Sequence, residues 1–239
     1  PVVSVGKRLF LLEDAHGDDH GPGSYTYPTN AVFTPNCFDM VSFECREGDD
    51  EVTFNVKLAS EITNPWNSGI GLSVQTIDIY IDTDHQPGSG LTEALGGRRV
   101  EFEPECAWEY AIWVEGWNQK VFAADGSEVG GITAAVDSVN NVVSISVPKS
   151  SIGSPQPGWG FQVFVLGQEG FPVQGNLRVR EVMAQAAEWR FGGGDDGMYD
   201  PNVIDMLVPA GRVQEDILGA YDVKAKKLAE VPMVYPGFE

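Results

Sequence analysis

The chain has 239 residues, and its 15 Lys and Arg against 35 Asp and Glu give a formal net charge of −20. This acidity excludes a nucleic-acid groove and attachment to an anionic membrane surface, because both need clustered cations. The hydrophobic fraction of 42% and the aromatic fraction of 10% are enough for a folded core, which excludes a disordered chain.

Alternating apolar residues predict a series of short strands. Residues 41–45 and 52–58 alternate on either side of the turn Gly48-Asp49-Asp50, which predicts a β-hairpin with one solvent-facing side. Alternation predicts further strands at 77–81, 143–147 and 177–180. Residues 161–166 carry apolar side chains on both faces, which predicts a central strand. Helix is scarce, with one turn expected at 149–152 and a short helix within 213–221.

These elements indicate an all-β protein. Many short strands separated by turns, with 28 Gly and 15 Pro, are typical of a single antiparallel β-sandwich of jelly-roll or immunoglobulin-like type. Because no low-complexity linker or repeat divides the chain, we expect one module over residues 1–239. It would have an N-terminal extension or strand at 1–12 and a C-terminal tail at 222–239. No stretch approaches the roughly 18 apolar residues of a membrane span.

Three cysteines would leave one thiol unpaired if a disulfide forms. Cys37 and Cys45 flank a predicted strand, and a rise of about 3.3 Å per residue would separate them beyond disulfide reach. A disulfide would therefore involve Cys106. The alternative is three buried thiols that act as small hydrophobic residues.

The first of three acidic loops covers residues 13–23. It places Asp14, Asp18 and Asp19 within six positions, between glycines that free backbone carbonyls. Such oxygen-rich loops suit Ca²⁺, which takes six to eight oxygen ligands at about 2.3–2.6 Å. Because these oxygens outnumber His16 and His20, we interpret the histidines as solvated or as supporting residues rather than zinc ligands. The alternative is a solvated acidic turn.

Two further acidic loops are weaker candidates for a cation. Asp82 and Asp84 follow the predicted strand 77–81 with spacing similar to an EF-hand loop, although Pro87 replaces the turn glycine and no helices flank it. A polar hairpin connection is the alternative. Asp195 and Asp196 follow a run of three glycines, where metal coordination and a flexible acidic loop are equally consistent with the sequence.

The six tryptophans have two possible roles. Most are expected to fill the core of a large sandwich. Trp66, in Asn64-Pro65-Trp66-Asn67, and Trp117 lie near predicted turns, so they are the candidates for exposed rings that stack on sugars. Motifs for a nucleophilic serine, a phosphate-binding loop or a zinc protease are absent from the sequence. Among 35 acids no catalytic carboxylate pair can be singled out, so we expect a non-catalytic protein.

Motifs along nearly the whole chain resemble the glucodextranase C-terminal module family, whose members look to be appended to amylopullulanases. The resemblance rests on the following motifs: Gly17-Asp18-Asp19-His20-Gly21-Pro22-Gly23-Ser24-Tyr25-Thr26-Tyr27-Pro28, Asn64-Pro65-Trp66, Tyr80-Ile81-Asp82-Thr83-Asp84, Trp108-Glu109-Tyr110-Ala111 and Trp189…Phe191-Gly192-Gly193-Gly194-Asp195-Asp196. It implies a DOMON-like β-sandwich that is non-catalytic, extracellular and calcium-bound through the first loop. It also makes Asp39 a metal candidate beside Asp14, Asp18 and Asp19.

Two functions compete at this point. In the preferred hypothesis the protein is a calcium-binding structural subunit that self-assembles into a filament or layer at the cell surface. Pro1–Leu12 and the apolar tail 231–238 would each add a strand to a neighbouring subunit, although both could instead pack on their own sandwich. In the alternative, the protein is a carbohydrate-binding accessory module of an amylolytic or other glucan-active system, with a polysaccharide as its partner. The chain opens at Pro1 without an initiator Met, which fits a processed product, and export is expected from composition alone.

Overall fold

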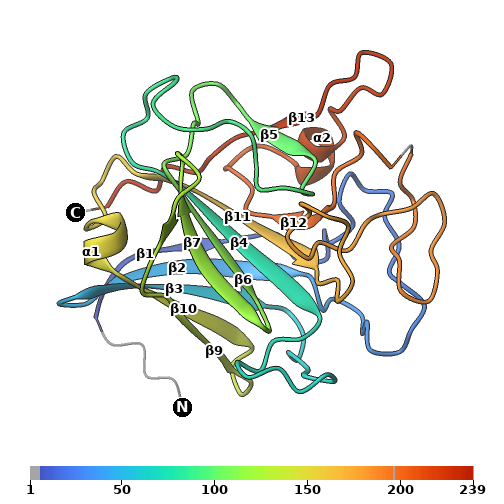
Figure 1. Ribbon diagram of the computed structural model, residues 1–239, viewed down its shortest axis with the longest axis horizontal. Helices are drawn as coiled ribbons and strands as arrows, with labels where there is room; N and C mark the ends of the chain where they lie inside the picture. Colours follow the sequence, from blue (N-terminus) through green and yellow to red (C-terminus); the bar gives the residue numbers. More distant parts are fainter. Residues whose placement is uncertain (1–5, 196, 239) are drawn as a thin grey trace.

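Residues 6–195 and 197–238 are described by a computed structural model, and most of their strands form two antiparallel sheets packed face to face (Figure 1). The five-stranded sheet contains, in spatial order, β1 (Lys7–Glu13), β2 (Met40–Glu47), β3 (Glu51–Leu58), β10 (Val142–Pro148) and β9 (Thr133–Asp137). The six-stranded sheet contains β12 (Val203–Met206), β11 (Gly160–Gly167), β4 (Gln75–Asp82), β6 (Tyr110–Glu115), β7 (Asn118–Ala123) and β8 (Glu128–Val129). The predicted all-β sandwich is confirmed.

The predicted hairpin is formed by β2 and β3, in a register that places Phe43 opposite Val56 and Cys45 opposite Phe54. Its apolar face lies in the core between the sheets, where the rings of Phe43 and Phe54 stack with centroids 5.9 Å apart. Its other face is polar and is hydrogen-bonded to the neighbouring strand β10, as in the contact between Asn55 and the hydroxyl of Ser144 at 2.6 Å.

The predicted central strand is β11, which lies between β12 and β4 and is buried along its whole length. Both its faces are covered because a second apolar layer packs on the outer side of the six-stranded sheet. This layer includes β5 (Val100–Phe102), β13 (Ala229–Val231), which pairs with β5 in parallel, and α2 (Gln214–Leu218), all of which gather near the top of Figure 1. The helix α1 (Lys149–Ile152) is the single turn that the sequence predicts.

The strand predicted at 177–180 is wrong. Leu177 and Arg178 have φ values of 46° and 57°, which are incompatible with an extended strand. The side chain of Asn176 fixes this bend by accepting a hydrogen bond from the N–H of Arg178 at 3.1 Å and donating one to the carbonyl of Val179 at 3.1 Å. The alternation of four residues gave no sign that the Asn176 side chain would bind the backbone here and so prevent the pairing of a strand.

All three cysteines are buried free thiols. The disulfide involving Cys106 is therefore a wrong expectation, and the alternative of three buried thiols is confirmed. Cys37 and Cys45 belong to the core between the sheets, whereas Cys106 lies in the outer apolar layer.

Both ends of the described chain pack on their own sandwich. Strand β1 pairs with β2, and in the tail Val234 exchanges backbone hydrogen bonds with Phe161 at 2.8 Å. The ring of Phe238 lies 5.7 Å from that of Phe10. The apolar tail is thus not left without partners, and the part of the proposed N-terminal extension at 1–5 lies outside the described residues. Within the described ranges, no helix has the length and apolar character needed to cross a membrane.

Candidate functional site

Acidic residues far apart in the sequence meet where the two sheets join. Asp14 follows the last residue of β1, Asp39 precedes the first residue of β2, and Asp205 lies within β12 of the opposite sheet. Carboxylate oxygens of Asp18, Asp39 and Asp205 all lie within 4.8 Å of one another. We call Asp14, Asp18, Asp39 and Asp205 the acidic cluster.

The acidic cluster has more carboxylate oxygens than donors. Asp39 and Asp205 are fully buried, whereas Asp14 and Asp18 are half-buried. Backbone N–H groups reach one oxygen each of Asp14 and Asp39 and both oxygens of Asp205. In contrast, Asp14 Oδ2, Asp18 Oδ1 and Asp39 Oδ1 are buried and have no hydrogen-bond partner among the described residues.

Burial and mutual repulsion raise the pKa values of all four carboxyl groups. Burial is the main cause in each case, and it raises the pKa of Asp14 to about 8 and that of Asp18 to about 6. The neighbouring carboxylates add to the effect, since the charge of Asp14 helps to raise the pKa of Asp205 well above its usual range. Ionising four such groups together is costly unless a cation compensates. The residues therefore fit a hard divalent cation with oxygen ligands.

Of the four residues that the sequence suggested for the first site, three belong to the acidic cluster. The fourth, Asp19, is buried beside it and accepts a hydrogen bond from the hydroxyl of Tyr27. Sequence reasoning missed Asp205 as a member of the acidic cluster. A single carboxylate inside the apolar run 203–207 was the signal that could have identified it, because an isolated charge in a buried strand needs a partner.

The second acidic loop brings Asp82, Asp84 and Glu109 together, again with oxygens within 4.8 Å of one another. Unlike the acidic cluster, these carboxylates are supplied with donors. Asp82 accepts hydrogen bonds from two backbone N–H groups and from the hydroxyl of Tyr235 at 2.6 Å. Glu109 accepts from the N–H and hydroxyl of Thr83 at 2.6 and 3.1 Å. These donors favour the polar connection, and a cation bound by Asp82 and Asp84 stays a prediction.

In the third acidic loop, Asp195 is exposed and lines a shallow depression that also includes Asp222 and Lys224. Asp196 lies outside the described residues. Among the described residues, Asp195 does not belong to a group of three or more His, Cys, Asp or Glu side chains close enough to hold one metal ion.

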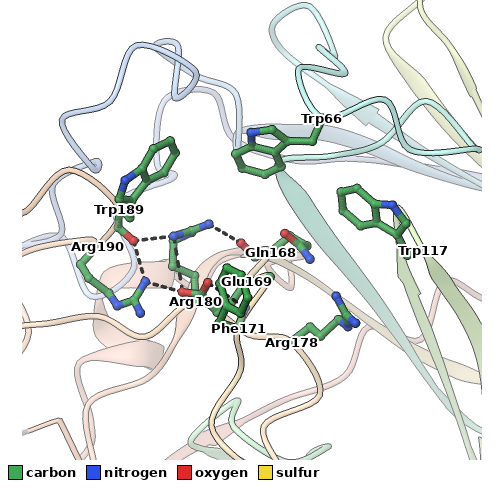
Figure 2. A pocket seen from close by; sticks show the side chains of 10 residues that line it. Trp66, Trp117, Gln168, Glu169, Phe171, Arg178, Arg180, Trp189 and Arg190 are labelled. Carbon is green, nitrogen blue, oxygen red and sulfur yellow. Dashed lines mark hydrogen bonds and ion pairs between the residues drawn. The ribbon is translucent and has the colours of Figure 1, made fainter.

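A second site is a pocket of about 600 Å³ at the end of the six-stranded sheet where β6 and β11 terminate and β4 begins. Figure 2 shows aromatic rings on three sides of it, with arginine side chains between them. The aromatic residues come from different loops and the lining is completed by polar residues, as follows: Trp66, Trp117, Phe171 and Trp189, with Gln168, Glu169, Gly170, Arg178, Arg180 and Arg190.

Trp117 is presented by the tight turn between β6 and β7. The backbone N–H of Trp117 donates a hydrogen bond to the Glu115 carboxylate at 3.2 Å, and that carboxylate also accepts one from the Asn118 side chain. Gly116 is required in this turn because an added Cβ would lie 2.1 Å from the carbonyl oxygen of Leu72. The turn thus leaves the Trp117 side chain 45% exposed at the pocket.

Trp66 lies on the loop before β4, and Figure 2 shows it between Trp189 and Trp117. The side chain of Asn64 closes this loop by accepting a hydrogen bond from the N–H of Ser68 at 2.8 Å and donating one to the Ser68 carbonyl at 3.0 Å. The indole of Trp66 is half-buried, and its centroid lies 6.2 Å from that of Trp189. The two rings form one wall of the pocket.

Arg180 fastens the wall that carries Trp189. Its guanidinium donates to the carbonyl oxygens of Trp189 and Gln168 at 2.5 and 2.7 Å and lies 5.1 Å from the ring centroid of Phe33. Burial lowers the pKa of Arg180 to about 10, so the group stays charged at neutral pH. The aromatic wall is therefore held by buried, charge-assisted hydrogen bonds.

Phe171 projects from the loop that follows β11 and is 92% exposed. An apolar ring in this position gains nothing from the core, but its face is available to a ligand. Pockets with aromatic walls and a few fixed polar groups are typical of small-molecule and sugar recognition. Exposed aromatic faces suit the apolar faces of sugar rings.

The sequence identified Trp66 and Trp117, and the structure brings both to this pocket. It missed Trp189, since nothing in the sequence separates that residue from Trp108, Trp113 and Trp159, which are buried. It also missed Phe171, although an aromatic residue between Gly170 and Pro172 is a signal for an exposed ring on a loop.

Comparison with known proteins supports a binding role. Residues 9–235 match the family described as the C-terminal binding-module, SLH-like, of glucodextranase. The search of curated proteins found no match. Because the match extends over nearly all of the sandwich, including the acidic cluster and the aromatic pocket, the chain belongs to the family of SLH-like C-terminal binding modules of glucodextranase.

Proposed function

We propose that the protein is a non-catalytic carbohydrate-binding accessory module that acts outside the cell or at its surface. The observation that carries the proposal is the convergence of Trp66, Trp117 and Trp189 on one pocket. Membership of a binding-module family supports it and favours this function over the self-assembling structural subunit. The internal pairing of the described tail also removes the main argument for strand exchange between subunits.

In this proposal the aromatic walls bind the sugar rings, and the polar groups of the pocket orient them. A sugar ring would lie against Trp117, while the wall of Trp66 and Trp189 would contact a neighbouring sugar along the chain. The polar side chains of the lining, such as Glu169 and Arg178, can accept hydrogen bonds from sugar hydroxyls or donate to them and would fix the orientation of the bound sugar.

Isothermal titration against a panel of α-glucans and acidic polysaccharides tests this function. Trp66→Ala and Trp117→Ala are each expected to weaken binding about tenfold or more, since aromatic anchors dominate the energy of such sites. Leu91→Ala removes a side chain of similar exposure, 40%, outside the pocket and is the matched control. Binding that is absent across the panel, or that both tryptophan variants leave unchanged, would refute the proposal.

A structural Ca²⁺ in the acidic cluster is the second part of the proposal. Its support is the set of buried oxygens without donors on Asp14, Asp18 and Asp39. With Asp205, these residues would hold the ion at the junction of the two sheets. The ion would supply charge compensation and rigidity, not chemistry at a substrate. Elemental analysis of the purified protein showing no calcium, together with no calcium-dependent change in stability, would refute it.

A further inference from the structure

The aromatic pocket concentrates positive charge on a strongly acidic protein. Arg178, Arg180 and Arg190 are three of only 15 cationic residues in a chain with a net charge of −20. Two carboxylates lie close to them, Glu169 and Glu115. Three positive and two negative charges leave a local excess of one positive charge, at the place where ligand binding is proposed.

Two of the arginines are already engaged. Arg180 is buried and bound to the carbonyls of Trp189 and Gln168. Arg190 pairs with Glu169 and donates to the carbonyl of Trp189 at 2.9 Å. These two residues build the wall and share the single carboxylate of Glu169, so Arg178 is the arginine at the pocket that takes no part in holding the wall.

Arg178 differs from both. Its side chain is 35% exposed, and its Nε forms a loose ion pair with Glu115 Oε1 at 3.9 Å, which is too long for a hydrogen bond. Glu115 is already used by the turn that presents Trp117. Figure 2 shows the guanidinium of Arg178 on the side of the pocket where Trp117 lies, with no interaction drawn to the other lining residues.

The backbone holds Arg178 in a costly conformation. Both Leu177 and Arg178 are in the left-handed region, with φ values of 46° and 57°, which is unfavourable for non-glycine residues. Hydrogen bonds to the Asn176 side chain at 3.1 Å and from the N–H of Glu169 at 2.8 Å fix the Arg178 backbone there. Strain of this kind is concentrated at functional sites, where a side chain must be pre-positioned.

From these contacts we infer that the pocket binds a glycan with an anionic substituent, a carboxylate or a sulfate group. The sugar ring lies against Trp117, and the substituent pairs with the guanidinium of Arg178. A planar guanidinium can form two parallel hydrogen bonds to such a group, which a neutral hydroxyl cannot match. The inference rests on the proposed carbohydrate-binding function and adds the class of sugar.

The overall charge of the protein limits which polyanions can bind. A net charge of −20 repels polyanions in general, but repulsion is screened beyond about 8 Å at physiological salt. Binding of an acidic glycan therefore needs both the ring contact and the local cation. A polyanion without sugar rings should bind poorly.

Titration of four polymers onto the full chain tests the inference: neutral dextran, polygalacturonate, dextran sulfate and polyglutamate. We expect at least one of the two acidic glycans to bind about tenfold or more tightly than dextran, and the stronger of them identifies the substituent as carboxylate or sulfate. Arg178→Gln should remove that preference. Arg212→Gln, which changes an exposed arginine paired with Glu103 elsewhere, should preserve it.

The outcomes separate this inference from the function on which it rests. If binding depends on Trp117 but dextran binds as tightly as both acidic glycans, the acidic-sugar inference is wrong and carbohydrate binding stands. If polyglutamate binds as tightly as the acidic glycans and Trp117→Ala has no effect, simple charge attraction explains the data and both proposals are wrong. An unchanged preference in Arg178→Gln also overturns the inference.

Discussion

The backbone N–H of Met40 donates a hydrogen bond to Asp205 Oδ2 at 2.5 Å, which joins the start of β2 to β12 of the opposite sheet. Asp205 and Asp39, the residue before Met40, both belong to the acidic cluster. A cation bound by these residues would therefore tie the two layers of the sandwich together as well as order the loop at 13–23. Its removal should affect the whole fold rather than one loop.

Chelation is expected to lower the melting temperature, and added calcium should restore it. A ligand at 100 times its dissociation constant stabilises the native state by about 2.7 kcal/mol, which corresponds to about 5–10 °C for a protein of this size. Differential scanning calorimetry with a chelator and then with excess Ca²⁺ measures the shift.

Asp39→Asn tests whether the calcium response comes from an ion bound in the acidic cluster or from the negative charge of the protein in general. Removing this charge should reduce the response to calcium and leave the chelated protein as stable as before or more so, because repulsion within the cluster decreases. Asp49→Asn, at an exposed turn, should retain the full response. A calcium response that survives Asp39→Asn undiminished would place the ion elsewhere.

The raised pKa values predict opposite pH trends with and without calcium. The folded pKa values of Asp14 and Asp18 are raised to about 8 and about 6, above the unfolded value of 3.8, so the folded state binds more protons than the unfolded state. In a chelated sample the free energy of unfolding should therefore fall as pH rises from about 4 to about 8. Urea titrations across this range measure the trend.

Calcium affinity should change in the other direction, because the ion binds the ionised carboxylates and releases protons. Titration calorimetry is expected to show weaker calcium binding as the pH falls below 8 and again below 6. If chelated protein became more stable with rising pH through this window, the ionisation assigned to the acidic cluster would be incorrect.

The contrast between the two sites shows what the sequence could predict. The period-two pattern was sufficient for β2 and β3, because alternation follows directly from which face of a strand is buried, and the continuous apolar run 161–166 was sufficient for β11, because both of its faces are covered. The carboxylates of the first loop were identifiable because they are adjacent in the chain. Asp205 was not, since its role depends on the pairing of β12 with β11, which brings a residue from the other sheet to the loop.

The same reasoning explains the incomplete prediction of the aromatic pocket. Trp66 and Trp117 stand beside turn residues, so local sequence indicates their exposure. The position of Trp189 depends on a hydrogen bond from the Arg180 side chain to its carbonyl, and that of Arg178 on a bend fixed by Asn176. A pattern of four residues cannot distinguish such a bend from an edge strand.

Gly116→Ala tests whether the turn that presents Trp117 is rigidly placed. The new Cβ would overlap the carbonyl oxygen of Leu72 and lie 2.6 Å from Cβ of Ser68, so the turn must move. We expect a loss of about 1–3 kcal/mol in the free energy of unfolding, together with weaker glycan binding. Gly158→Ala, where an added Cβ meets nothing within 4 Å, is the control. Unaltered binding in the Gly116 variant would mean that Trp117 does not need this geometry.

The buried pair of Arg98 and Asp78 should matter far more for stability than the exposed ion pairs. Arg98 is fully buried and donates two hydrogen bonds to Asp78, at 2.6 and 2.8 Å, and its third nitrogen donates to the carbonyl of Gly96 at 2.8 Å. Asp78→Ala would leave a buried guanidinium without its counter-charge, a change that costs about 3–5 kcal/mol. Denaturant unfolding monitored by tryptophan fluorescence gives this value.

The partly exposed pair of Arg212 and Glu103 provides the comparison for that measurement. Its atoms are as close, at 2.7 Å, but both side chains reach solvent. Solvent screens the attraction, so Glu103→Ala is expected to cost less than about 1 kcal/mol. If the two variants lost similar stability, distance rather than burial would govern these ion pairs. The expected difference would instead show that Arg98 holds the loop before β5 against β4. Arg98 also donates to the carbonyl of Asn176 at 3.0 Å, so it links the same loop to the segment that positions Arg178.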